Sequence, residues 1–217
     1  MTFDLLFRDA LVVDGTGGVP FPGDVGVAGG LIRAVGRLGR VQAVRTIDAR
    51  GLIVAPGFVD MHTHSDLRLL AEPRAEAKVM QGVTTEVIGQ DGLSFAPVND
   101  ETMALIRQQT ASWNGDAPGC DWAWASMGDY LRRFDRRTSV NVACLVPHGN
   151  VRLLAMGYDD RRPTPDELAE MRRLIGQGME EGAVGLSTGL SYPPAMYADT
   201  DEMAELCREV AARGGFF

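Results

Sequence analysis

Short apolar runs separated by turn residues fill the N-terminal part of the chain. The runs cover residues 5–7, 10–13, 24–27, 31–35 and 46–48, and glycine, proline or aspartate residues stand between them. Runs of this length between turn residues are typical of β-strands. The pattern therefore predicts a small β-sandwich domain over residues 1–55. The glycine cluster at 15–18 is followed by Pro20 and Pro22 rather than by a helix, which argues against a phosphate-binding loop there.

From residue 56 onward, strand-like runs alternate with helix-like segments. The runs at 57–61, 84–89, 140–146 and 183–187 predict strands, and the segments 72–81, 99–109, 164–179 and 199–213 predict helices. This alternation is typical of βα units that build a parallel sheet. The sequence therefore predicts an α/β fold, in which residues 56–217 form about four βα units of a TIM barrel after the β-sandwich domain. Phe216 and Phe217 are predicted to begin a fifth strand.

The predicted barrel is incomplete. A closed barrel of this kind needs eight βα units and typically about 250 residues, more than residues 56–217 provide. A half-barrel leaves two strand edges and apolar surface unpaired. We therefore expect the sequence to be the N-terminal part of a longer enzyme. The alternative is a half-barrel that is stable on its own and dimerises.

Residues 112–125 fit neither pattern. The segment holds all three tryptophans, Trp113, Trp122 and Trp124, among glycine, proline and aspartate residues. A loop of this kind over the mouth of a barrel serves as a substrate lid, but buried aromatic side chains also serve as packing. The sequence leaves both interpretations open.

Composition narrows the class of protein and of partner. Hydrophobic residues make up 45% of the 217-residue chain, and the formal net charge is −8. Nucleic-acid binding depends on clustered lysine and arginine, so we expect no nucleic-acid partner. The chain has no apolar run of about 18 residues and no signal-peptide pattern, so we expect a cytoplasmic protein without a membrane partner. The three cysteines are scattered and are expected to be reduced thiols.

Two of the three histidines, with a single residue between them, stand at the end of the first predicted barrel strand. Side chains alternate between the faces of a strand, so His62 and His64 point to the same side, whereas on a helix they would diverge by about 200°. Imidazole is the commonest metal-binding side chain, and two that converge supply half of a zinc-type coordination shell. These residues alone are compatible with two interpretations: a metal site, or two histidines that form ordinary hydrogen bonds in a loop.

The same stretch resembles a known family. The motif APGFVDMHTHSD at 55–66 is similar to the first barrel strand of the amidohydrolase superfamily, and KVMQGVTTEVIGQDGLSFAPV at 78–98 resembles its D-aminoacylase (N-acyl-D-amino-acid deacylase) branch. The resemblance extends over essentially the whole chain, including GLSTGLSYPP at 185–194. It implies an enzyme with one or two Zn²⁺ ions that hydrolyses N-acyl-D-amino acids to a carboxylate and a D-amino acid.

Asp91 is the third candidate metal ligand. It follows the second predicted strand, and the carboxyl ends of barrel strands carry the functional groups. A carboxylate aimed into the barrel mouth completes or bridges a metal site, whereas the alternative is an aspartate that only forms a turn. The better-known D-aminoacylases have a cysteine here, in a GNCG motif, where this sequence has GQDG. Carboxylate is a harder ligand than thiolate, so this departure leaves the identity and number of the metal ions open.

Three further residues follow the third and fourth predicted strands. His148 comes after the third strand, and Ser187 and Tyr192 belong to the polar loop after the fourth. All three are candidates for substrate binding, since a hydroxyl such as that of Tyr192 donates to an oxyanion or a carboxylate. The alternatives are a hydrogen bond that closes the strand end for His148, and packing under the following two prolines for Tyr192.

The resemblance places no catalytic residue within this chain. The catalytic aspartate and further histidines of the family lie on later strands, so residues 1–217 alone are expected to be inactive. A cyclic-amide hydrolase of the dihydroorotase or hydantoinase type is a second hypothesis. A lysine on the fourth strand would favour it, but the single lysine, Lys78, falls in the first predicted barrel helix. A catalytically inactive fragment or interaction module is the third hypothesis.

Overall fold

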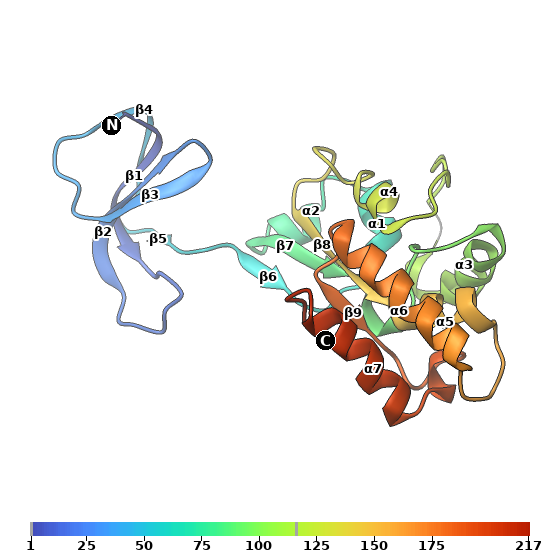
Figure 1. Cartoon of the computed structure of the whole chain (residues 1–217). Helices are drawn as coiled ribbons and strands as arrows, with labels where there is room; N and C mark the ends of the chain where they lie inside the picture. Colours follow the sequence, from blue (N-terminus) through green and yellow to red (C-terminus); the bar gives the residue numbers. More distant parts are fainter. Residues whose placement is uncertain (1, 116) are drawn as a thin grey trace. The chain divides into compact units, whose positions relative to one another are not determined.

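A computed structural model describes residues 2–115 and 117–217. Contacts within the chain divide it into two units, one that ends at Gly57 and one from Phe58 to Phe217. Each unit is built around its own sheet (Figure 1).

The first unit contains five strands in one sheet. They are β1 (Thr2–Val12), β2 (Phe21–Ala28), β3 (Leu31–Gly36), β4 (Gln42–Asp48) and β5 (Ile53–Val54). The order is β3-β2-β1-β4, and β5 also pairs with β1. Strand β1 runs antiparallel to β2 and parallel to β4 and β5. The β domain is confirmed, and its described strands form a single sheet rather than the two sheets of a sandwich, because the long β1 pairs along both of its edges.

Strand β1 joins two runs that the apolar pattern separates. The register shifts between Phe7 and Ala10, and Asp9 has a φ of 58°. This is a bulge, which absorbs extra residues without ending the strand. On β2, Gly26 lies under the ring of Phe3, where a Cβ would come within 2.6 Å of the ring. Only glycine therefore allows this close approach of ring and backbone.

Asp24 of β2 holds the bulge in place. Its side chain is buried and accepts hydrogen bonds from the backbone N–H groups of Asp9 and Leu38, at 3.0 Å each, and from Arg8 Nη1 at 2.9 Å. Burial by itself raises the pKa of Asp24, but these donors outweigh it and hold the pKa below its ordinary value. The carboxylate is therefore ionised in the folded sheet.

We expect Asp24→Ala to destabilise the first unit by about 2 kcal/mol, because two partly buried backbone N–H groups and Arg8 lose the buried carboxylate that accepts from them. The folded-state pKa lies below the unfolded value, so this stabilisation is present above the unfolded pKa and is lost as pH falls through the folded pKa. Urea unfolding followed by far-UV circular dichroism measures both effects. Gln42→Ala is the control, because Gln42 is exposed on β4 and we expect a change below about 0.5 kcal/mol. Equal losses in both variants would contradict this role of Asp24.

The second unit contains a parallel sheet. Its strands are β6 (Phe58–Asp60), β7 (Val83–Ile88), β8 (Asn141–Pro147) and β9 (Gly185–Ser187), paired in that order. All three pairings are parallel. Gly185 of β9 also forms an isolated parallel bridge with Phe216, at the place where a fifth strand is predicted. The half-barrel predicted from the alternating pattern is confirmed.

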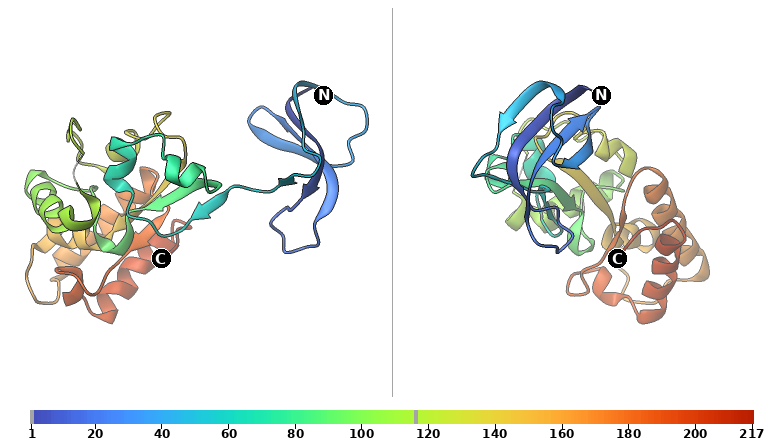
Figure 2. Two further views of the ribbon diagram at one scale, coloured as in Figure 1. Left: turned by 180° about the vertical axis from the view of Figure 1, so that it is seen from behind. Right: turned by 90° about the vertical axis from the view of Figure 1, so that its left-hand side faces the viewer.

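Helices connect these strands and cover the sheet. They are α1 (Asp66–Ala71), α2 (Glu76–Val79), α3 (Asp100–Asn114), α4 (Met127–Leu131), α5 (His148–Met156), α6 (Pro165–Glu180) and α7 (Thr200–Ala211), with 3-10 turns at Gln90–Gly92 and Ala195–Tyr197. Helix α6 packs against both α5 and α7 (Figures 1 and 2). The core lies between strand residues such as Ile88 and Val146 and helix residues such as Ile175 and Leu206.

Two helix predictions differ from the structure. The helix predicted over 72–81 is shorter in the structure, where only α2 (Glu76–Val79) lies in this range. Pro73 disfavours helical backbone in the residue before it, and a separate helix, α1, ends at Ala71. Helix α5 was not expected. Seven of its residues are buried, so it lacks the polar face that makes an amphipathic helix visible in a sequence. The predicted capping box of Thr164 and Glu167 is confirmed.

The three tryptophans have different surroundings in the structure. Trp124 is buried, and the Arg107 guanidinium lies 4.1 Å from the ring centroid of Trp122, so the packing interpretation holds for these two. Helix α3 extends beyond its predicted end, so Trp113 belongs to its last turn and not to a loop. Trp113 remains 44% exposed.

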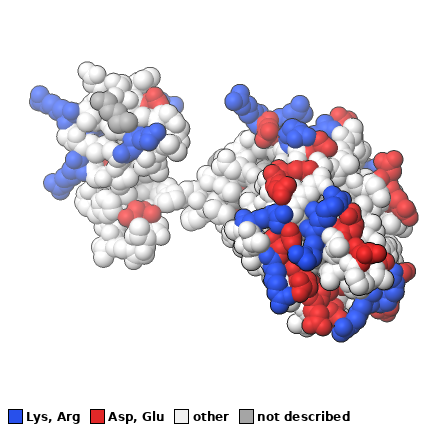
Figure 3. Space-filling model, in the orientation of Figure 1, with Lys and Arg blue, Asp and Glu red and all other residues white. Residues whose placement is uncertain are grey.

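Charged side chains of both signs intermingle over the face that includes α6 and α7 (Figure 3). Ion pairs there join Arg172 to Glu209 at 3.2 Å and Arg161 to Glu167 at 2.7 Å. Because positive and negative side chains alternate there, the described residues of this face form no large patch of a single charge. No helix in the described ranges is long and apolar enough to cross a membrane.

Candidate metal centre

The structure brings His62, His64 and Asp91 together beyond the carboxyl ends of β6 and β7. Nε2 of His64 lies 3.2 Å from one carboxylate oxygen of Asp91, and Nε2 of His62 lies 3.8 Å from the other. One ligand atom from each residue lies within 4.8 Å of the other two. A tetrahedral zinc ion with ligand bonds of about 2.1 Å would hold its ligand atoms about 3.4 Å apart. The donor types and their spacing therefore fit a metal ion.

The cluster is open on one side. The side chains of His62, His64 and Asp91 are 60%, 30% and 32% exposed. A cavity of about 390 Å³ adjoins the cluster. It is lined by Met61, His62, Gln90, Asp91, Leu145, Leu186, Ser187, Thr188, Phe216 and Phe217. Ligand and substrate sites have volumes of this order, and a catalytic metal keeps an open coordination position.

The backbone of the GQDG turn explains how Asp91 reaches the histidines. Asp91 has a φ of 55°, in the left-handed region that aspartate tolerates better than most residues. Gly89 has a φ of 79°, and a Cβ there would lie 2.4 Å from the carbonyl oxygen of Leu145. The turn therefore requires glycine at position 89, and it directs the Asp91 carboxylate toward the end of β6.

The side chain of Gln90 stabilises the same turn. Its side-chain Nε2 donates to the carbonyl oxygens of Met61, at 2.8 Å, and Val87, at 2.9 Å. Met61 directly precedes His62, so this buried amide ties the histidine segment to the end of β7. Sequence reasoning missed Gln90, because its partners are backbone groups that leave no motif.

Ser187, predicted to bind substrate, is buried at the end of β9. Its hydroxyl donates to the carbonyl oxygen of Gly89 at 2.5 Å and accepts from the N–H of Gly92 at 3.0 Å. These two bonds hold both ends of the turn that carries Asp91. The geometry therefore supports a role for Ser187 in positioning the metal ligand.

We expect Ser187→Ala to weaken Zn²⁺ or Co²⁺ binding about tenfold, because the turn that carries Asp91 loses both bonds. Equilibrium dialysis of the purified chain measures this affinity. Ser191→Ala is the matched control, since Ser191 is exposed in the same loop and no change is expected. Equal affinities for Ser187→Ala and the unaltered chain would contradict the positioning role.

His148, also predicted to bind substrate, is fully buried at the start of α5. Its Nε2 donates to Glu202 Oε1 at 2.8 Å, and its Nδ1 lies 2.8 Å from the hydroxyl of Thr188. Arg152 Nη1 donates to the second oxygen of Glu202 at 2.5 Å. Only Thr188 of this network lines the cavity, so His148 reaches the cavity through the Thr188 hydroxyl.

Asp66 is a buried carboxyl group close behind the histidines. It accepts a hydrogen bond from Ser94 Oγ, and burial raises its pKa to about 6 in spite of that bond and of the nearby His64. His64 Nδ1 is buried and has no hydrogen-bond partner among the described residues. The side of the cluster that faces the protein is thus poorly hydrated.

Tyr192, the third predicted substrate-binding residue, is 36% exposed. Its ring centroid lies 6.2 Å from that of Trp113, which in turn lies 6.4 Å from that of His64. Sequence reasoning singled out Trp113 only as part of a tryptophan-rich segment. Its position beside the histidine pair depends on the length of α3.

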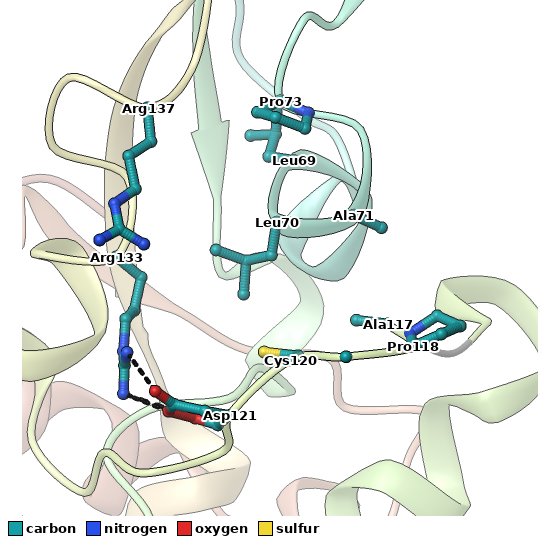
Figure 4. A pocket seen from close by; sticks show the side chains of 11 residues that line it. Leu69, Leu70, Ala71, Pro73, Ala117, Pro118, Cys120, Asp121, Arg133 and Arg137 are labelled. Carbon is teal, nitrogen blue, oxygen red and sulfur yellow. Dashed lines mark hydrogen bonds and ion pairs between the residues drawn. The ribbon is translucent and has the colours of Figure 1, made fainter.

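A second cavity, of about 510 Å³, lies between α1 and the segment 117–121 (Figure 4). Leu69 and Leu70 line one part of it, and Arg133 donates to the two carboxylate oxygens of Asp121 at 3.0 and 2.6 Å. None of its described lining residues belongs to the metal cluster. Cavity size alone therefore does not locate the site.

Lys78 does not approach the end of β9. Its Nζ donates to Asp60 and to the hydroxyl of Thr63, at 3.1 Å from the latter, and lies 3.6 Å from the buried carboxylate of Glu86. The lysine that would favour a cyclic-amide hydrolase is therefore occupied elsewhere.

The chain is similar to known proteins over nearly all of its length. The chain is 40% identical to N-acyl-D-aspartate deacylase and 39% identical to D-aminoacylase, both from Alcaligenes xylosoxydans xylosoxydans; these alignments cover 98% and 99% of this chain and 42% and 43% of the relatives. It is also similar to the crystal structure of N-acyl-D-glutamate deacylase from Bordetella bronchiseptica complexed with zinc and a phosphonate mimic of the tetrahedral intermediate. That match has a TM-score of 0.82 and 36% identity, and covers 98% of this chain and 44% of the other.

The chain thus spans under half the length of the relatives it matches. The model of the amidohydrolase family matches residues 45–215, which include the three clustered residues and all four strands of the parallel sheet. The chain belongs to the amidohydrolase family.

Proposed function

We propose that this chain forms the N-terminal β domain and the first half of the barrel of a zinc-dependent enzyme that hydrolyses N-acyl-D-amino acids. The products are a carboxylate and a D-amino acid. The observation that carries the proposal is the convergence of His62, His64 and Asp91 beside an open cavity, in a chain 36–40% identical to deacylases of this class. Two of these relatives are named for different substrates, N-acyl-D-aspartate and N-acyl-D-glutamate, so sequence identity alone does not assign the side chain of this protein's substrate.

The chain's own residues have separable roles in this proposal. His62 and His64 would hold a zinc ion through their ring nitrogens, and Asp91 would hold it through its carboxylate. A zinc ion, when bound, lowers the pKa of a water ligand toward ~7 and polarises a carbonyl group. Ser187 and Gln90 hold the ligands in place.

The cavity walls supply polar contacts for the substrate. Thr188 lines the cavity, and its hydroxyl lies 2.8 Å from Nδ1 of the buried His148. Tyr192 lies outside this cavity wall, on a partly exposed ring beside Trp113, and we assign its hydroxyl as a donor for the substrate carboxylate or for the oxyanion formed at the scissile carbonyl. The family resemblance assigns proton transfer to the leaving amine to residues beyond this chain.

The test uses the protein purified at the length that its source cells produce. We expect release of acetate and the D-amino acid from N-acetyl-D-amino acids but not from their L-enantiomers, loss of activity after chelation, and recovery with Zn²⁺. His62→Ala and His64→Ala should each abolish metal-dependent turnover. Unchanged turnover in these variants would remove the histidines from the site, and hydrolysis of cyclic amides alone would overturn the substrate assignment.

A further inference from the structure

The cavity between α1 and the segment 117–121 has the size of a ligand site, and none of its described lining residues belongs to the metal cluster. Its volume of about 510 Å³ falls within the usual range of small-molecule sites. Figure 4 shows Arg133 and Arg137 on one side of the cavity and the end of α1 on the other. The two sides differ in chemical character, so the cavity suits a ligand that has one charged and one apolar part.

The side formed by α1 and by the start of the segment 117–121 is mainly apolar. Leu70 points from α1 toward the arginines and is only partly buried, whereas its neighbour Leu69 is buried (Figure 4). The other apolar residues that line this side are Ala71, Pro73, Ala117 and Pro118. An aliphatic chain gains up to about fourfold in affinity for each methylene group that it buries against such a surface.

Hydrogen bonds hold the sides of this cavity together. The N–H of Ser139 donates to the carbonyl oxygen of Pro73 at 2.9 Å, which joins the segment after the arginines to the segment after α1. Arg133 donates to both carboxylate oxygens of Asp121, at 3.0 and 2.6 Å, and to the carbonyl oxygen of Ala123 at 2.8 Å. The cavity is therefore preformed, and a preformed site binds a ligand at a lower cost in entropy.

Arg137 supplies a positive charge to the cavity. The guanidinium of Arg133 is paired with Asp121, whereas no hydrogen bond or ion pair joins the guanidinium of Arg137 to any residue that the structure describes (Figure 4). Hydrogen bonds from the N–H of Ala123 and from Arg133 hold the pKa of Asp121 below its ordinary value, and the charges of Arg133 and Arg137 act in the same direction. Asp121 is therefore ionised, and the described lining residues carry two positive charges and one negative charge.

We propose that this cavity binds a small aliphatic monocarboxylate, with the carboxylate on Arg137 and the chain against Leu70 and the apolar residues beside it. A guanidinium presents parallel N–H groups that match the two oxygens of a carboxylate. The charge balance of the lining leaves a place for one negative charge, and the ionised Asp121 repels a second. The site therefore selects a single negative charge at one end of an apolar chain. It is independent of the function proposed above, because it uses none of the metal-binding residues.

Isothermal titration calorimetry with octanoate tests the site. The purified protein is first freed of metal ions, so that no carboxylate binds to a metal at the histidine pair. We expect octanoate to bind, and hexanoate and butanoate to bind more weakly, by about two- to fourfold for each methylene group removed. Octylamine, with a positive head group, and octanedioate, with two carboxylates, should each bind at least about tenfold more weakly than octanoate. No measurable octanoate binding, or equal affinities for octanoate and octylamine, would overturn the proposal.

Three variants locate the bound molecule. Arg137→Ala should weaken octanoate binding about tenfold or more, because the carboxylate loses its charged donor, and the variant should fold, since Arg137 is exposed. Leu70→Ala should reduce the dependence of affinity on chain length. Arg132→Ala is the matched control: it removes one positive charge from the same segment, but Arg132 pairs with Asp129 and does not line the cavity, so we expect unchanged affinity. Equal octanoate affinities in Arg137→Ala and the unaltered protein, or equal losses in Arg137→Ala and Arg132→Ala, would contradict the assignment.

Discussion

Asp91→Ala is expected to lower the affinity of the chain for Zn²⁺ or Co²⁺ by about 100-fold or more. The carboxylate lies between the two imidazoles, 3.2 Å and 3.8 Å from their Nε2 atoms, and its loss leaves two ligands where three converge. Loss of a group that only orients a ligand costs about 10- to 100-fold, so loss of a ligand should cost more. Metal content after dialysis and the visible spectrum of the Co²⁺ form measure the effect.

Two further variants separate ligation from turn formation. Asp91→Asn keeps the turn-forming character of the side chain but removes its charge, so it should bind metal weakly. Asp91→Cys places a thiolate at the same position and should restore binding with a shift toward softer ions such as Cd²⁺, together with a thiolate-to-Co²⁺ charge-transfer band. Asp100→Ala, at the exposed start of α3, is the control. Full metal occupancy in Asp91→Ala would reduce Asp91 to a turn residue.

Glu202→Ala is expected to cost the second unit about 3–5 kcal/mol of unfolding free energy. The Glu202 carboxylate is buried and joins His148, at 2.8 Å, to Arg152, at 2.5 Å. Removing one member of a buried ion-paired network leaves its partners desolvated and uncompensated. The network also links α7 to α5 and, through Thr188, to the loop beside the cavity. Thermal or urea unfolding followed by tryptophan fluorescence reports on this unit, which contains all three tryptophans.

The acid side of the stability curve tests the same network. Burial works to raise the pKa of Glu202, but the hydrogen bonds from His148 and Arg152 outweigh it and hold the pKa below its ordinary value. Its contribution is therefore present above the unfolded pKa and is lost as pH falls through the folded pKa.

Glu202→Gln, which keeps the shape of the side chain, should fold and remove this pH dependence. Glu205→Ala on the same helix is the control, because the Glu205–Arg208 pair is partly exposed and is worth well under 1 kcal/mol. Equal losses for positions 202 and 205 would contradict a structural role of the buried network.

Local patterns determined most of the architecture of this protein. Alternation of apolar runs with helical segments predicted the order of β6 to β9, and the capping residue Thr164 located the start of α6. The spacing of His62 and His64 by one residue placed both side chains on one side of the chain. Each of these inferences depends on residues within a few positions of one another, where backbone geometry alone fixes which side chains share a face.

Other features of the fold depend on contacts that no local pattern records. The apolar pattern does not reveal that β1 pairs along both edges within one sheet. It also hides α5, since a helix that is buried on most sides shows no polar face. The helix predicted over 72–81 is limited to Glu76–Val79, since Pro73 disfavours helical backbone in the residue before it.

The sequence by itself indicated a pair of candidate metal ligands, and the tertiary structure decided which distant residues lie beside them. The histidine pair and the GQDG turn are visible in the chain, but the bonds from Ser187 to the Asp91 turn join residues more than ninety positions apart. The same holds for Glu202 and His148, and for Trp113 beside His64. Such contacts form because parallel strands bring their carboxyl ends to one edge of the sheet, and this long-range geometry leaves no trace in the spacing of neighbouring residues.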